Sequence, residues 1–146
     1  MINKKINYFK RPMGEILFRG KLPYSGNWIH GGLVERDGET YIVGILNSLR
    51  IDGVEVIPET MGQFTGMTDE NGVKIFEGDV VEGLFFFGMS INAVVTFKGG
   101  SFGLKWYREG IEEFSAFSSF CNVTFKVIGN IFDNPELMKG GAKWVD

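Results

Sequence analysis

The stretch that decides the fold is VVEGLFFFGMSINAVVTF, residues 80–97. It contains two runs rich in Val, Ile and Phe, at 80–87 and 91–97, on either side of Gly88-Met89-Ser90. β-Branched and aromatic residues favour strands, and a short connection containing glycine is typical of a hairpin. The stretch therefore predicts two adjacent antiparallel strands.

Similar short apolar runs continue on both sides of this hairpin. Asp37-Gly38 lies between two of them and predicts a second hairpin, because Gly tolerates the positive φ of primed turns. Asp52-Gly53 is interpreted as another turn, as are 66–72 and 77–79, which are rich in Gly, Asp and Asn. We expect further strands at 15–19, 28–35, 40–46, 54–57, 62–65, 73–76, 101–107 and 123–132.

Two segments have helical signals. Aromatic or aliphatic residues recur every three positions from Ile111 to Phe120, which favours a short helix, although a loop that places its aromatics in the core fits equally. Asn134-Pro135-Glu136 is a helix start, and Gly140-Gly141 ends that helix after one or two turns. The expected fold class is all-β, mainly antiparallel and strongly bent or barrel-like, with one or two short helices including one at the C-terminus.

Length and composition indicate one domain that holds its core without disulfides. The chain has 146 residues, with 21 Gly, 4 Pro and 14 Phe, and this length suffices to bury a sizeable core. We expect residues 1–13 to form a flexible basic arm and residues 14–146 a single β-rich domain.

The cellular compartment follows from what the sequence lacks. Its single cysteine, Cys121, cannot form an internal disulfide. The N-terminus has no signal-peptide pattern, and the longest apolar run, 84–87, is too short to span a bilayer. We expect a cytoplasmic protein in a bacterial or phage-infected cell, with no membrane contact.

The motifs that suggest catalysis lack their partners. Residues 99–103 match G-x-S-x-G, but the hydrolase order requires an acid and a histidine after the serine, whereas the one histidine, His30, lies upstream. A Gly-rich hairpin turn explains the match better. Cys121 and His30 would need to meet in space to act as nucleophile and base, and a buried cysteine and a structural histidine are the simpler interpretations. We expect no enzymatic activity and no cofactor.

A group of acidic and amide side chains suggests either turns or a cation site. The weak candidates for binding a divalent cation are Asp69, Asn71, Glu77 and Asp79. Their spacing differs from that of an EF-hand loop, and the same residue types are favoured in turns for conformational reasons. Turn formation is the preferred interpretation, and we expect no metal.

Nucleic-acid binding is the alternative function. Basic residues of the arm and aromatic residues on strands could contact phosphates and stack on bases. The net charge of −3 argues against it, because binding to nucleic acid requires clustered positive charge. The candidate contacts are Lys4, Lys5, Lys10, Arg11, Trp28, Trp106 and Tyr107.

The run Leu84-Phe85-Phe86-Phe87 does not alternate between apolar and polar residues. A strand with one wet face alternates, so either both faces of this strand are covered within the fold or one face meets another subunit. We favour the second explanation, with Phe85, Phe86 and Phe87 as candidates for an oligomer interface.

Three stretches together resemble the YopX family. They are EILFRGK at 15–21 with GNWI at 26–29, then TMGQFTGM at 60–67 with IFEGDVV at 75–81, and VIGNIFDNPEL at 127–137. The resemblance extends over nearly the whole chain after the N-terminal arm.

The resemblance implies a β-rich protein encoded by phages or prophages, which forms homo-oligomers and has no established activity. It supplies no catalytic residues. The expected function is therefore that of a phage accessory protein that acts through protein contacts as a homo-oligomer and binds a host or phage protein.

Overall fold

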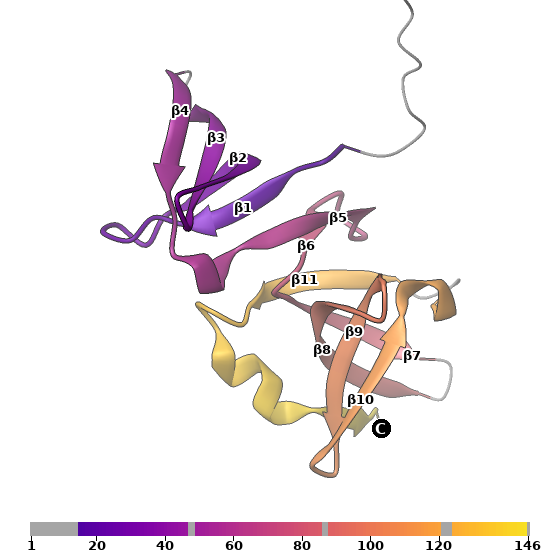
Figure 1. The fold of residues 1–146 in the computed structure, drawn as a ribbon. Coiled ribbons are helices and arrows are strands. Elements are labelled where there is room, and N and C mark those ends of the chain that lie inside the picture. The colour runs from indigo at the N-terminus through magenta and orange to yellow at the C-terminus, as the bar shows by residue number, and fades with distance from the viewer. Residues whose placement is uncertain (1–14, 47–48, 86–87, 121–123, 146) are drawn as a thin grey trace, which may run out of the picture.

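The computed structural model describes residues 15–145, except 47–48, 86–87 and 121–123. Within these residues the chain forms twelve strands and three short 3₁₀ helices, and every strand pairing is antiparallel. The strands make two open sheets, one from each half of the chain (Figure 1). The predicted all-β antiparallel class is confirmed, with two sheets in place of a closed barrel.

The first sheet has the strand order β4-β3-β2-β1-β5-β6. A 3₁₀ helix, η1 (Pro58–Thr60), connects β4 to β5. The strands are β1 (Phe18–Lys21), β2 (Trp28–Arg36), β3 (Glu39–Leu46), β4 (Leu49–Glu55), β5 (Gly62–Thr68) and β6 (Lys74–Phe76).

The second sheet has the order β10-β9-β8-β7-β11, with β12 paired to β8. The 3₁₀ helix η2 (Phe117–Ser119) precedes β11, and η3 (Pro135–Gly140) follows it. In Figure 1, η3 lies beside this sheet in yellow. The strands are β7 (Asp79–Phe85), β8 (Met89–Lys98), β9 (Ser101–Arg108), β10 (Ile111–Ala116), β11 (Phe125–Asn130) and β12 (Ala142–Trp144).

Each sheet has its own hydrophobic cluster. The smaller cluster, on the first sheet, is built on Ile29, Ile42 and Val56. The larger one lies on the second sheet and includes Leu104 and the aromatic rings of Phe120 and Phe125. The prediction of a single domain over 14–146 stays a prediction.

Both predicted hairpins are confirmed. β2 and β3 are joined by Asp37 and Gly38, whose φ angles of 52° and 80° are the two positive values of a type I′ turn. β7 and β8 pair with each other, with Val80 opposite Val94. These two valines are 0% and 6% exposed, and their neighbours Val81 and Val95 are each 1% exposed, so both faces of the hairpin are covered at this level.

The helix favoured for 111–120 is wrong over its first half. Glu109 and Gly110, with φ of 52° and 79°, form a tight turn after which β10 pairs with β9. The ring of Phe114 packs where Gly103 of β9 has no side chain. The residues after β10 do form a helical turn, η2, so the helix prediction holds for the second half of the segment 111–120.

Other predicted bounds also require correction. Asp52-Gly53 was predicted as a turn but lies inside β4. The pairing of β4 with β3 shifts register between Ile42 and Gly44, and this irregularity accommodates the φ of 123° at Gly53. The strand expected at 15–19 begins at Phe18, and the one expected at 123–132 spans Phe125–Asn130. The C-terminal helix is confirmed in its position as η3, and the strand that follows it, β12, was not predicted.

Replacing Gly103 by Ala tests the packing of β10. A Cβ atom at this position would lie 2.4 Å from the Ser115 carbonyl oxygen and 2.6 Å from Phe114 Cζ. We expect Gly103→Ala to lower the free energy of unfolding by about 1–3 kcal/mol, as overpacking does, measured by urea denaturation. Gly32→Ala is the control, because the nearest atom to its Cβ would be Val43 Cγ2 at 3.2 Å, a much milder contact than those at Gly103. Equal stability of the two variants would contradict the β9–β10 pairing.

Candidate functional site

The two faces of the first sheet differ in chemistry. In the register of β1 and β2, Arg19 pairs with His30 and Lys21 pairs with Trp28. Side chains alternate along a strand, so these four lie on one face, opposite the buried Ile29. The face that carries them meets the start of the second sheet.

Arg19 and Asp79 form a buried ion pair between the two sheets. Arg19 Nη2 donates to Asp79 Oδ1 at 2.7 Å, and the two side chains are 10% and 4% exposed. The guanidinium also lies over the rings of Trp28, at 4.4 Å from the centroid, and Phe76, at 4.8 Å. One cation thus joins β1, β2, β6 and β7.

The second oxygen of Asp79 serves the backbone. Phe76 N–H donates to Oδ2 at 2.7 Å, so the carboxylate also closes the turn between β6 and β7. The pKa of Asp79 is raised on balance, because burial outweighs the Arg19 guanidinium and the Phe76 amide, which both lower it. Because both oxygens accept charge-assisted or backbone hydrogen bonds, we assign Asp79 as ionised.

One hydrogen-bond donor of Arg19, its Nε–H group, is not used by the described residues. Its Nε is buried and has no hydrogen-bond partner within the described residues. An unsatisfied buried donor costs about 1–3 kcal/mol. No role was predicted for Arg19 from its sequence context, although two cations among positions 17, 19 and 21, which share one face of a strand, indicate that this face is partly polar.

A cavity of about 480 Å³ opens beside this pair. We call it the junction cavity, because strands of both sheets line it. Its walls combine four apolar side chains with two cations, one carboxylate and one imidazole. The described lining residues are Leu17, Arg19, His30, Val73, Lys74, Phe76, Asp79 and Val127.

The pKa of His30 depends on the positive charges that line the junction cavity. Its ring packs against Phe76 with centroids 5.3 Å apart. Partial burial lowers the pKa of His30 below 6.5, and the positive charges of Arg19 and Lys74 lower it further. Lys74 in turn forms an ion pair with Glu15.

A second polar contact joins the first sheet to the segment after β11. Asp133 accepts hydrogen bonds from Trp28 Nε1 at 2.9 Å and from Asn130 Nδ2 at 3.0 Å, and it forms an ion pair with Lys21. The hydrogen bond from Lys21 is the largest cause that lowers the pKa of Asp133. The ring of Phe132 packs on Trp28 with centroids 5.9 Å apart.

The candidate cation ligands occupy different structural positions. Asp69 accepts backbone N–H bonds from Asn71, Val73 and Val127 at 2.8–3.0 Å. Burial alone would raise the pKa of Asp69, but these backbone donors outweigh it and lower the pKa. Glu77 lies in the β6–β7 turn, and burial raises its pKa. Among the residues that the structure describes, no three His, Cys, Asp or Glu side chains are grouped to hold a metal ion.

The three candidate nucleic-acid contacts that the structure describes, Trp28, Trp106 and Tyr107, do not share a surface. Lys4, Lys5, Lys10 and Arg11 lie outside the described residues, as does the candidate nucleophile Cys121. Trp106 is 8% exposed in the larger cluster, and its Nε1 donates to Glu113 at 2.6 Å. Tyr107 follows it on the opposite face of β9, whereas Trp28 belongs to the first sheet.

The G-x-S-x-G match is a hairpin turn. Gly99 and Gly100, with φ of 61° and 81°, connect β8 to β9, and Ser101 is the first residue of β9. His30 lies in β2 of the other sheet. Within the described chain, no helix is long and apolar enough to cross a membrane.

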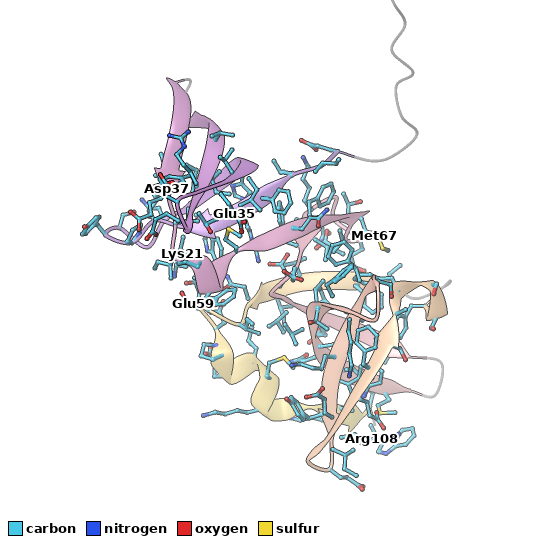
Figure 2. The ribbon with its side chains drawn as sticks, viewed as in Figure 1. Lys21, Glu35, Asp37, Glu59, Met67 and Arg108 are labelled. Atoms are coloured by element: carbon cyan, nitrogen blue, oxygen red, sulfur yellow. The ribbon has the colours of Figure 1, made fainter. Side chains whose placement is uncertain are left out.

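A patch of mixed apolar and charged residues lies on β7 and β11, near the C-terminal end of the described chain. Leu84 is 61% exposed and Val145 56% exposed, and both line a hollow of about 290 Å³. Glu82 and Lys126, which pair across β7 and β11, line the same hollow. We call these four residues the outer patch. Figure 2 shows side chains over both sheets.

The candidate interface phenylalanines adjoin this patch in sequence. Phe86 and Phe87 lie outside the described residues. The backbone of Phe85 pairs with Met89, and its side chain is outside the described part of the structure.

Removing the charge of Asp79 tests the ion pair. Asp79→Asn keeps an oxygen for the Phe76 amide but leaves the Arg19 cation buried without a counter-charge. We expect a loss of about 3–5 kcal/mol in the free energy of unfolding, measured by urea denaturation. The double variant Arg19→Met/Asp79→Asn should recover part of this loss. A loss below about 1 kcal/mol in the single variant would instead mean a solvated pair.

Titration of His30 by NMR tests the positive field of the junction cavity. It is the only histidine, so its signal is unambiguous, and its midpoint should lie below 6.5. A nearby cation disfavours the imidazolium, so Lys74→Gln should raise the midpoint toward 6.5. Lys98→Gln is the control, since Lys98 lies over Phe114 in the second sheet. Identical midpoints in the wild type and Lys74→Gln would refute the arrangement.

Comparison with known proteins gives one family. No curated protein matches the chain. The family model described as YopX protein matches residues 18–139. This range runs from the start of β1 into η3, and it contains both polar contacts between the sheets and most of the three stretches that carry the resemblance. The chain belongs to the YopX family.

Proposed function

We propose that this YopX-family protein is a phage or prophage accessory protein that acts in the cytoplasm through protein contacts, as a homo-oligomer and without enzymatic activity. The observation that supports this proposal is the exposure of Leu84 and Val145 together in the outer patch, at 61% and 56%. Exposed apolar side chains that adjoin one another are typical of surfaces that bind other proteins.

Leu84 differs from the earlier apolar residues of β7 in its exposure to solvent. The run that begins at Leu84 does not alternate, which left two explanations: coverage of both faces within the fold, or coverage by another subunit. Val80 and Val81, earlier on β7, are both covered within the fold. Leu84 is not, so its apolar character favours an intermolecular contact.

The charges of the outer patch suit a second copy of the same chain. A two-fold interface brings the same surface together from both subunits, and each residue must find its complement on that same surface. Lys126 provides a positive charge, and Glu70 and Glu82 provide negative charges, beside the two apolar residues. A two-fold rotation can therefore place a carboxylate of each subunit near the Lys126 ammonium of its partner. The assembled form would then present its remaining surfaces to a host or phage protein.

Light scattering coupled to size-exclusion chromatography tests this proposal. The wild type should elute as a dimer or larger at micromolar concentration, and Leu84→Glu should shift it to monomer, because a buried carboxylate without a partner opposes association. Tyr24→Glu is the control, since Tyr24 is fully exposed in the first sheet's turn region. Thermal unfolding monitored by circular dichroism verifies that both variants fold. A monomeric wild type, or an oligomer that Leu84→Glu leaves intact, would contradict the proposal.

A further inference from the structure

The junction cavity contains an excess of positive charge. Arg19 and Asp79 neutralise each other, and Lys74 adds a second cation. The partner of Lys74, Glu15, is 54% exposed and is not among the described lining residues. A ligand that displaces this surface carboxylate would therefore meet one uncompensated positive charge.

Arg19, which lines the cavity, also has hydrogen-bonding capacity that the described residues leave unused. Its Nη2 donates to Asp79 at 2.7 Å and to the Glu77 carbonyl oxygen at 3.5 Å, but its buried Nε has no partner within the described chain. Asp79 contacts the guanidinium through a single oxygen, because its other oxygen accepts from Phe76 N–H. Arg is suited to a planar, two-oxygen acceptor, and here the arrangement leaves part of that capacity unfilled.

The rest of the cavity is apolar. Leu17, Val73 and Val127 line it together with the ring of Phe76. Its volume of about 480 Å³ lies within the usual range for small-molecule sites, which bury most of the ligand against apolar walls and orient it through a few polar groups.

We propose that the junction cavity binds a monoanionic ligand, a single carboxylate carried on a compact apolar body. The carboxylate is held by Arg19 and Lys74, and the body packs on Phe76 and Val73. A dianion such as a phosphate monoester would exceed the one uncompensated charge. The same chemistry occurs in a free aromatic or aliphatic acid and in the C-terminal carboxylate of a peptide with an apolar last residue. This inference goes beyond the proposed function.

NMR titration of the full chain with 3-phenylpropanoate tests the site. The control ligand is 3-phenylpropanamide, which has the same shape without the charge. We expect saturable shifts at backbone amides of β1, β2 and β6 with the acid, and affinity lower by about tenfold or more with the amide, because hydrogen bonds to charged groups are the stronger ones. Acetyl-Ala-Ala-Phe with a free or an amidated C-terminus provides the peptide arm. Tighter binding of the free peptide than of the small acid identifies a peptide terminus as the ligand class, and the reverse identifies a free acid.

Three variants assign the binding to the proposed residues. Lys74→Gln should weaken binding of the acid about tenfold while leaving the fold intact, because Lys74 is 43% exposed. Glu15→Gln should tighten it, since it frees Lys74. Lys98→Gln, in the second sheet, should leave it unchanged.

Three results would overturn the proposal: no saturable binding of any acid at millimolar concentration, equal affinity for acid and amide, or an affinity that Lys74→Gln does not change. Repeating the titration with Leu84→Glu separates this proposal from that of self-association, because Arg19 and Lys74 lie on β1 and β6 of the first sheet, whereas Leu84 lies on β7 of the second.

Discussion

The ion pair between Arg19 and Asp79 is the contact on which the arrangement of the two sheets depends. It stands where the strands that begin the two sheets meet, and both partners are almost fully buried. A charge in that position is unfavourable unless its partner is held at hydrogen-bond distance. The pair therefore constrains the sheets more strictly than an apolar contact would, since apolar side chains can slide without losing their burial.

Neighbouring residues support the geometry of this pair. Gly62 of β5 has no side chain, and a Cβ there would lie 2.4 Å from the Glu77 carbonyl oxygen. The turn that carries Asp79 can therefore approach the first sheet closely. Trp28 contacts the Arg19 guanidinium and donates a hydrogen bond to Asp133, so a single aromatic side chain participates in both polar contacts between the sheets.

Local patterns predicted the strands well and the site poorly. The hairpins around Asp37-Gly38 and between 80–87 and 91–97 depend on neighbours in sequence, and periodicity and turn residues were sufficient to find them. The segment 111–116 was assigned wrongly because its pairing depends on the Glu109-Gly110 turn and on the space above Gly103, a contact between strands that spacing alone does not show. Arg19 and Asp79 are 60 residues apart, and Asp79 was considered as a turn or cation ligand. No local pattern indicates that its partner is an arginine.

The two hydrophobic clusters have a consequence for how the protein unfolds. Residues 15–76 supply the first sheet and residues 79–145 the second, so each half of the chain could act as a local unit of unfolding. The halves are coupled because β6 contributes Ile75 to the larger cluster. They are also coupled because unfolding of either half would leave Arg19 or Asp79 without its counter-charge. The cooperativity of unfolding therefore depends on contacts at the boundary between the sheets. A ligand bound in the junction cavity would make the two halves unfold as one unit.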